Sequence, residues 1–112
     1  SDKRFQDLAL CLGDWIWEVD TNSEYTFVSE KIMNILGYNP DGIIGNTLFD
    51  LMPKKEAVRV NEIFKEISSE KKPIVDMENW NLNKERNEVC LLTNGIPMLD
   101  GESIFFGFPR CR

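Results

Sequence analysis

The sequence contains no histidine, and this absence excludes several kinds of active site. A His-ligated haem needs an imidazole on the iron, and Ser-His-Asp or Cys-His catalysis needs an imidazole as general base. Covalent haem attachment through a CxxCH motif is excluded as well, because the motif does not occur. Any chemistry in this chain has to proceed without histidine.

Cysteines are few and far apart. Cys11, Cys90 and Cys111 are an odd number, and no CxxC pair occurs among them. This spacing fits neither a disulfide framework nor a thiolate metal site, so we expect no metal and a reducing, cytoplasmic environment. Without a histidine to activate a thiol, Cys90 and Cys111 are interpreted as small apolar strand residues rather than redox sensors.

Long apolar runs and clusters of basic residues are also missing. No segment approaches the ~20 apolar residues that cross a bilayer, and the first residues lack the hydrophobic region of a signal peptide. The formal net charge is -6, whereas nucleic acids and anionic membranes attract clustered cations. We expect no nucleic-acid partner and no direct membrane contact of this piece. A longer parent protein could still be anchored in a membrane elsewhere.

The composition that is present fits one soluble globular domain. The chain has 112 residues, of which 42% are hydrophobic and 29% charged, close to ordinary usage. We expect an N-terminal amphipathic helix within residues 1–12 and one domain over residues 13–112. The helix is predicted from apolar residues at helical spacing, namely Phe5, Leu8, Ala9 and Leu12.

The remaining pattern predicts an α+β domain. Period-two alternation predicts a hairpin at its start, and helical spacing predicts a short helix over 30–36 and a single turn beginning at Pro40. The longest helix is expected from Pro53 to Glu70, because Pro73 stops it. Two strands at the start and three at the end predict one antiparallel sheet with helices on one face. The last three strands are expected over 74–83, 88–99 and 103–108.

Two stretches carry a family resemblance. The segment GDWIWEVDTNSEYTFVSEKIMNILGYNPDGIIGNTLFDLM resembles the N-terminal half of PAS domains, in which an aspartate ends the first strand and a serine-led helix closes on Gly-Tyr. The segment IVDMENWNLNKERNEVCLLTNGIPMLDGESIFFGF resembles the last three strands of the same family. The resemblance runs from about Gly13 to Phe108. It implies a five-stranded antiparallel sheet that, with the helices, encloses a pocket for a small ligand or cofactor, and a dimerising N-terminal helix.

The sequence departs from the family pattern at several positions, and one of these departures excludes a cofactor. Light-sensing relatives carry a flavin-reactive cysteine in the helix after Gly-Tyr, where this sequence has Leu48, so a cysteinyl-flavin is excluded. Ser23 stands where many relatives carry glycine, PKKEAV opens the long helix in place of an often acidic segment, and GFPRCR lacks the Asp-x-Thr exit signal. The cofactor stays unknown, with a small organic ligand as one option.

The resemblance to PAS domains implies which face of each strand points inward. The residues on that face, with some from the helices, are the candidate pocket residues. The alternative is a core filled by its own side chains. Asn79 and Asn81 distinguish the two, because a buried amide without a partner costs about 1–3 kcal/mol. If Trp80 and Leu82 face inward instead, the amides are surface residues. The candidates are Trp17, Val19, Tyr25, Phe27, Leu51, Met52, Ile63, Met77, Asn79, Asn81, Leu91, Thr93 and Phe105.

Trp80 has two interpretations. On the outer sheet face it would form an apolar patch with Leu82, Leu92 and Phe106 that suits a partner helix, and otherwise it belongs to the core. The candidate dimer-interface residues are therefore Phe5, Leu8, Leu12 and Trp80.

Paired carboxylates are the remaining sign of catalysis. Glu18 with Asp20, and Asp76 with Glu78, are spaced i, i+2 on single strands, a pattern more typical of a solvated sheet face.

The leading hypothesis is a non-enzymatic PAS sensor that forms a homodimer and signals to an effector domain of the same parent chain. The alternatives are a ligand-free interaction module and, more remotely, a small carboxylate enzyme.

Overall fold

The computed structural model describes residues 7, 15–98 and 101–109. Its five strands form one antiparallel sheet in the order β2-β1-β5-β4-β3. The strands from the two halves of the sequence thus join in one sheet as predicted, because β1 and β5 pair from Trp15 opposite Gly107 to Val19 opposite Ser103. The strands are β1 (Trp15–Val19), β2 (Tyr25–Val28), β3 (Ile74–Leu82), β4 (Glu88–Pro97) and β5 (Ser103–Pro109).

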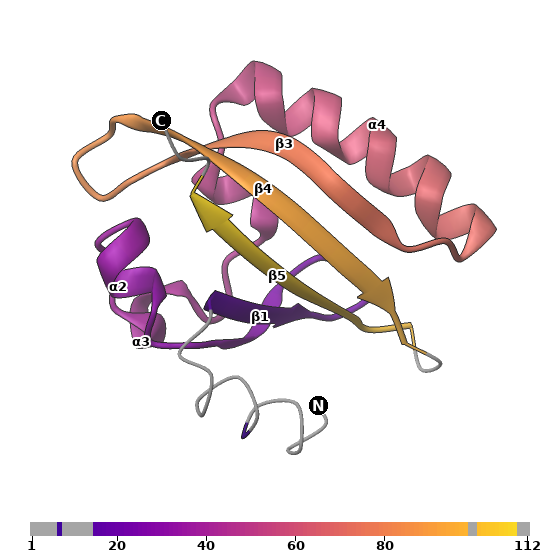
Figure 1. The fold of residues 1–112 in the computed structure, drawn as a ribbon, viewed down its shortest axis with the longest axis horizontal. Helices are drawn as coiled ribbons and strands as arrows, with labels where there is room; N and C mark the ends of the chain where they lie inside the picture. The colour runs from indigo at the N-terminus through magenta and orange to yellow at the C-terminus, as the bar shows by residue number, and fades with distance from the viewer. Residues whose placement is uncertain (1–6, 8–14, 99–100, 110–112) are drawn as a thin grey trace.

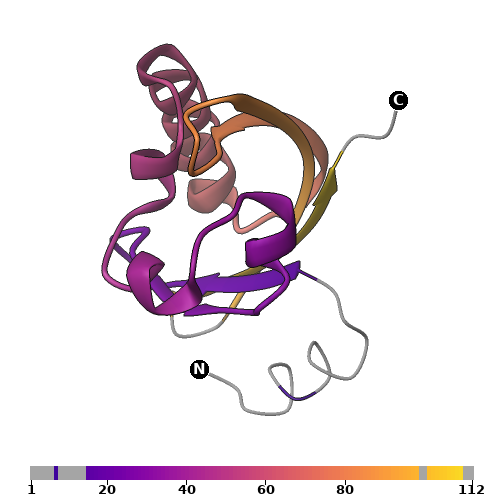
Figure 2. The same cartoon turned by 90° about the vertical axis from the view of Figure 1, so that its left-hand side faces the viewer.

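The helices lie on the concave side of the curved sheet (Figure 2). The longest of them, α4, runs beside β3 (Figure 1). The predicted α+β class, with one sheet and helices on one face, is confirmed. The helix predicted within residues 1–12, with Phe5, Leu8 and Leu12, lies outside the described residues. The described helices are α2 (Ile32–Ile35), α3 (Pro40–Ile43), η1 (Leu48–Leu51) and α4 (Lys54–Glu70).

Local sequence explains why the short helices begin where they do. The Asn39 side chain accepts a hydrogen bond from the Asp41 backbone N–H at 3.0 Å, and Pro40 occupies the first turn of α3, as predicted. At η1, Asp50 accepts from the Thr47 backbone N–H at 2.9 Å and completes a capping box. No helix in the described ranges is long and apolar enough to cross a bilayer.

A bulge in the first hairpin changes which residues of β2 face inward. Glu18 lies opposite Phe27, but the register then shifts, so that Val19 lies opposite Tyr25. Because directly opposed residues share a face, Tyr25 faces the helices with Val19, and Phe27 lies on the outer face with Glu18. The prediction that Tyr25 and Phe27 share the inner face is therefore wrong for Phe27. Simple alternation does not anticipate an extra residue in one strand.

Helix α4 is hydrogen-bonded to the sheet edge. The Glu56 carboxylate accepts from the Trp80 backbone N–H at 2.8 Å, and the Arg59 guanidinium donates to the Glu78 carbonyl at 3.0 Å. Glu56 and Arg59 also pair with each other at 2.8 Å. Since β3 is an edge strand, these side chains occupy backbone groups that would otherwise be open to another strand.

Candidate ligand-binding site

A small cavity lies between the inner sheet face and the helices. Its volume is about 10 Å³, enough for about one water molecule. Most of the candidate pocket residues are brought together here, namely Trp17, Tyr25, Met52, Met77, Asn79, Asn81 and Thr93.

The two asparagines face inward. Asn79 is 3% exposed and Asn81 is 4% exposed, whereas Trp80 between them is 42% exposed on the opposite face. Thr93 donates a hydrogen bond from its hydroxyl to the Asn79 side-chain oxygen at 2.7 Å, across the β3–β4 pairing. Of the two interpretations of this strand, the one with inward amides and an outward Trp80 is confirmed.

Two tryptophans that line the cavity contain unpaired donors. The indole Nε1–H groups of Trp15 and Trp17 are buried, and neither has a hydrogen-bond partner. Their rings lie 4.5 Å apart between centroids. An unpaired buried donor costs about 1–3 kcal/mol, so both groups would gain from an acceptor.

The cavity wall is electrically neutral. None of the cavity-lining residues is Asp, Glu, Lys or Arg. Tyr25 is the one ionisable residue, and its burial, with a smaller contribution from the Asp50 charge, raises the pKa of its hydroxyl, which therefore stays protonated. The interior thus presents neutral polar groups set among aromatic and aliphatic side chains, the usual composition of a small-molecule site.

A row of aromatic rings extends from this cavity across the fold. Trp17 stacks on Phe105 at 5.7 Å between centroids, and Phe105 stacks on Phe64 at 5.4 Å with the planes 5° apart. Phe64 then meets Phe49 edge-on at 6.0 Å. The row joins β1, β5, α4 and η1, and so links sheet and helices.

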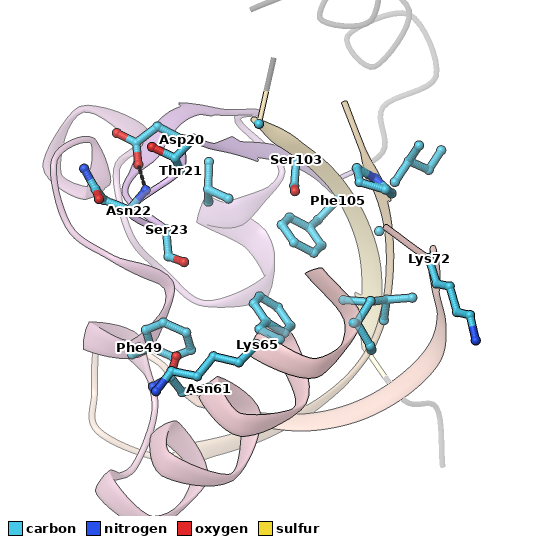
Figure 3. A pocket seen from close by; sticks show the side chains of 18 residues that line it. Asp20, Thr21, Asn22, Ser23, Phe49, Asn61, Lys65, Lys72, Ser103 and Phe105 are labelled. Atoms are coloured by element: carbon cyan, nitrogen blue, oxygen red, sulfur yellow. Dashed lines mark hydrogen bonds between the residues drawn. The ribbon is translucent and has the colours of Figure 1, made fainter. Parts of the chain in front are cut away.

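A second, larger hollow opens to the surface on the far side of this row. The cleft measures about 410 Å³ and lies between the β1–β2 turn, α4 and the β4–β5 hairpin. Val19 and Phe105, predicted as interior pocket residues, line this cleft instead. In Figure 3 the Phe105 ring projects into it, and the Lys72 amine extends away. The residues labelled around it include Asp20, Thr21, Asn22, Ser23, Asn61, Lys65 and Ser103.

Four candidate residues line neither hollow. Leu51 and Leu91 are buried in the core cluster, where they pack against other side chains. Ile63 is half-buried on α4 and borders neither the cavity nor the cleft. Phe27, turned outward by the bulge, borders a separate surface hollow of about 380 Å³. These four residues thus border neither the cavity nor the cleft.

Three further residues line the cavity. Trp15 is two residues before Trp17 on β1, so strand alternation puts it on the same inner face, and the sequence contained its signal. Leu48 was assigned by the resemblance to the cofactor-facing position of light-sensing relatives. Phe64 follows the candidate Ile63 directly on α4. Which of those two faces the cavity depends on the rotation of α4, and that is set by tertiary contacts.

The paired carboxylates do not converge on either hollow. Glu18 is on the outer face, yet it is only 4% exposed and accepts a hydrogen bond from the Thr26 hydroxyl at 2.8 Å. The expectation that Glu18 is solvated is therefore wrong, because its carboxylate is covered. Asp76 and Glu78 are exposed, as expected. The described part of the chain contains no group of three or more Cys, Asp or Glu residues that could hold a metal ion.

The fold is that of an α+β domain with one five-stranded antiparallel sheet and helices on its concave side. A family model described as "PAS domain" matches residues 13–108, and the chain belongs to this family. The resemblance found in the sequence is thereby confirmed. PAS domains are generally signal-sensing modules of sensor proteins and not catalysts.

Solved structures agree on the fold. One similar structure is the PAS-B domain of Drosophila melanogaster Cycle with bound ethylene glycol, with a TM-score of 0.75, 12% identity, and coverage of 86% of this chain and 99% of that one. A variant of the same Cycle domain, with bound glycerol, gives the same values. Another is a domain of a sensory box sensor histidine kinase/response regulator from Geobacter sulfurreducens, with a TM-score of 0.75, 16% identity and 96% coverage of each chain. No curated protein matches the sequence.

Proposed function

We propose that this PAS domain is the signal-input module of a larger signalling protein, and that it binds a small, uncharged, polar molecule in its interior. The observation that carries the proposal is the pair of buried indole donors, on Trp15 and Trp17, that lack acceptors beside the cavity. A ligand with a carbonyl or hydroxyl oxygen would supply the missing acceptor.

The charge and size of the cavity restrict the class of ligand. A charged ligand would be buried without a counter-charge, which is strongly unfavourable. Because the present cavity has room for about one water molecule, a larger ligand has to displace side chains as it enters. The Cycle PAS-B domain holds ethylene glycol in its wild-type form and glycerol in a variant, and both are small neutral polyols. We propose that molecules of this kind fit here too.

The test is a titration followed by NMR of the three indole N–H groups. Ethylene glycol and glycerol are the first probes, and mass spectrometry of gently extracted protein identifies any co-purified molecule. We expect the Trp15 and Trp17 signals to shift and to saturate, because an acceptor reaches their donors. The Trp80 signal is the internal control, since that side chain is 42% exposed on the other face. Equal, unsaturated shifts of all three signals, with no co-purified molecule, would contradict the proposal.

A second function is favoured by the outer sheet face. Trp80 and Phe108 are 42% and 47% exposed, and the strand register puts both on this face, away from the helices. We propose that the domain forms a homodimer through this face, with Phe5, Leu8 and Leu12 of the predicted N-terminal helix contributing. The dimer would then relay the signal to an effector domain of the same chain.

Sedimentation velocity over a range of concentrations tests the dimer. We expect a dimer that the substitution Trp80→Gln weakens, because Trp80 is an exposed aromatic anchor. The matched control is Val58→Gln, which removes an apolar side chain that is 67% exposed on α4, away from the sheet. A monomer at high concentration, with residues 1–12 intact, would disprove the dimer and leave the ligand proposal standing.

The net charge of -6 supports the rest of the proposal. We propose a cytoplasmic domain without nucleic-acid or direct membrane contact, since both surfaces attract clustered cations. A gel-shift titration with duplex DNA and a flotation assay with anionic vesicles test this, and binding in either assay at physiological salt would contradict it.

A further inference from the structure

One side chain borders both hollows. Phe64 lines the interior cavity of about 10 Å³ and also the open cleft of about 410 Å³. Its ring stacks face to face on Phe105, which lines the cleft, and Phe105 stacks in turn on Trp17, which lines the cavity. The stacked pair of Phe64 and Phe105 therefore stands between solvent and the buried polar groups.

Of the two rings, Phe105 is held in place. It is 3% exposed, and its ring lies close to β4 at Gly95, where an added Cβ would come within 2.5 Å of two ring carbons. On its other side is Trp17. Backbone on one side and an indole on another thus hold the Phe105 ring in place.

Phe64 is held less firmly. The hydrogen bonds from α4 to β3 are made by Glu56 and Arg59, and Phe64 follows Glu56 by about two helical turns. Phe64 itself is half-buried, and its ring meets Phe105 and Phe49. A rotation of its side chain toward the cleft would break ring contacts but no hydrogen bond that anchors the helix.

We propose that the cleft is the entrance to the interior site and that Phe64 is the gate between them. The size of the residue at this position then determines which molecules reach Trp15, Trp17 and the two asparagines. This inference rests on the proposed function in taking the interior as the binding site, but the gate can be measured without knowing the ligand.

The experiment measures acrylamide quenching of tryptophan fluorescence. Acrylamide is a small neutral amide, close in chemistry to the ligand class proposed, and it quenches an indole that it contacts. The background variant is Trp80→Phe, which removes the exposed indole and leaves Trp15 and Trp17 as the emitters, because the chain has three tryptophans. In this background we expect Phe64→Ala to raise the bimolecular quenching constant several-fold.

Two further variants make the result specific. Ile67→Ala is the matched control, because Ile67 lies on the same helix and lines the cleft but not the cavity, and we expect its quenching constant to equal that of the background. Phe64→Leu preserves an apolar side chain should Phe64→Ala fold poorly. We expect quenching to increase from Phe through Leu to Ala at position 64, with unchanged far-ultraviolet circular dichroism.

The outcomes separate the gate from the ligand. Quenching that is independent of the residue at position 64, or that rises equally in Ile67→Ala, would overturn the gate. If quenching follows the predicted order but no indole signal responds to any ligand, the gate holds and the sensor function fails. Ligand-induced shifts at Trp15 and Trp17 without any dependence on Phe64 indicate a different entrance and reject this one.

Discussion

The interior cavity and the surface cleft share a wall but are built differently. The cavity is enclosed by inner-face strand residues and a hydrogen-bonded pair, Thr93 and Asn79, both nearly inaccessible to solvent. The rim of the cleft includes a turn in which Asp20 accepts from the backbone N–H groups of Asn22 and Glu24 at 2.8 and 3.0 Å. A change in the cavity or in the shared wall should therefore cost folding energy, whereas the rim of the cleft should tolerate change.

The largest effect is expected where the shared wall meets β4. Gly95→Ala adds a Cβ within 2.5 Å of the Phe105 ring, which has to move toward Phe64. We expect a loss of about 1–3 kcal/mol in the free energy of unfolding, typical of overpacking, measured by urea denaturation. Gly42→Ala is the control, because its added Cβ meets no atom within 4 Å, and it should be neutral or slightly stabilising. Equal losses in both variants would show that the wall is not tightly packed.

The next effect concerns the buried pair in the cavity. Thr93→Val preserves the shape of the side chain but leaves the Asn79 oxygen without its donor at 2.7 Å. We expect a loss of about 1–2 kcal/mol, because a buried acceptor is left unsatisfied. The double variant Thr93→Val with Asn79→Leu should recover much of that loss, since both partners are then apolar. If the losses of the two single variants simply add in the double variant, a water molecule already satisfies the Asn79 oxygen.

A smaller, pH-dependent effect is expected at the anchor of α4. The Arg59 hydrogen bond, helped by that of the Trp80 N–H, outweighs partial burial and lowers the pKa of Glu56 below its ordinary value of 4.5. The folded chain thus gains stability above pH 4.5 and loses it as the pH falls through the lowered value. Glu56→Gln should cost about 1 kcal/mol at pH 7 and progressively less in acid.

Urea denaturation at several pH values between neutral and acid measures this difference. The control is Glu62→Gln, because the Glu62 carboxylate is 71% exposed and its ion pair with Lys65 is 3.9 Å long. We expect that substitution to have little effect at any pH, as for other solvated pairs. A Glu56→Gln deficit that stays constant into acid would rule out the ion pair as its origin.

The smallest effect is expected at the rim of the cleft. Ser23 has a positive φ of 64°, in the left-handed region that favours glycine. Ser23→Gly should stabilise the chain by less than about 1 kcal/mol, because relief of the backbone strain slightly exceeds the added entropy of the unfolded glycine. Thermal unfolding measures the gain. In contrast, Ser69→Gly within α4 should lower the melting temperature, because glycine destabilises a helix. A higher melting temperature in both variants would contradict the explanation by the positive φ of Ser23.

Periodicity in the sequence was enough to predict the order of the elements. The long helix and the last three strands appear within a few residues of their expected bounds, because β-branched and aromatic alternation and the stop at Pro73 are local signals. The inward direction of Asn79 and Asn81 followed from the family resemblance, and burial confirmed it. Phe27 and Ile63 were misplaced, because simple alternation does not register the extra residue of a bulge and because the rotation of α4 is set by tertiary contacts.

The amino-acid sequence by itself determined the family, the single antiparallel sheet and the exclusion of histidine-dependent chemistry, since these depend on composition and on patterns a few residues long. The tertiary structure alone decided that the predicted pocket divides into a cavity of about 10 Å³ and a cleft of about 410 Å³. The physical reason is that Phe64 and Phe105 are 41 residues apart in the chain, and only the packing of α4 on the sheet brings their rings to 5.4 Å.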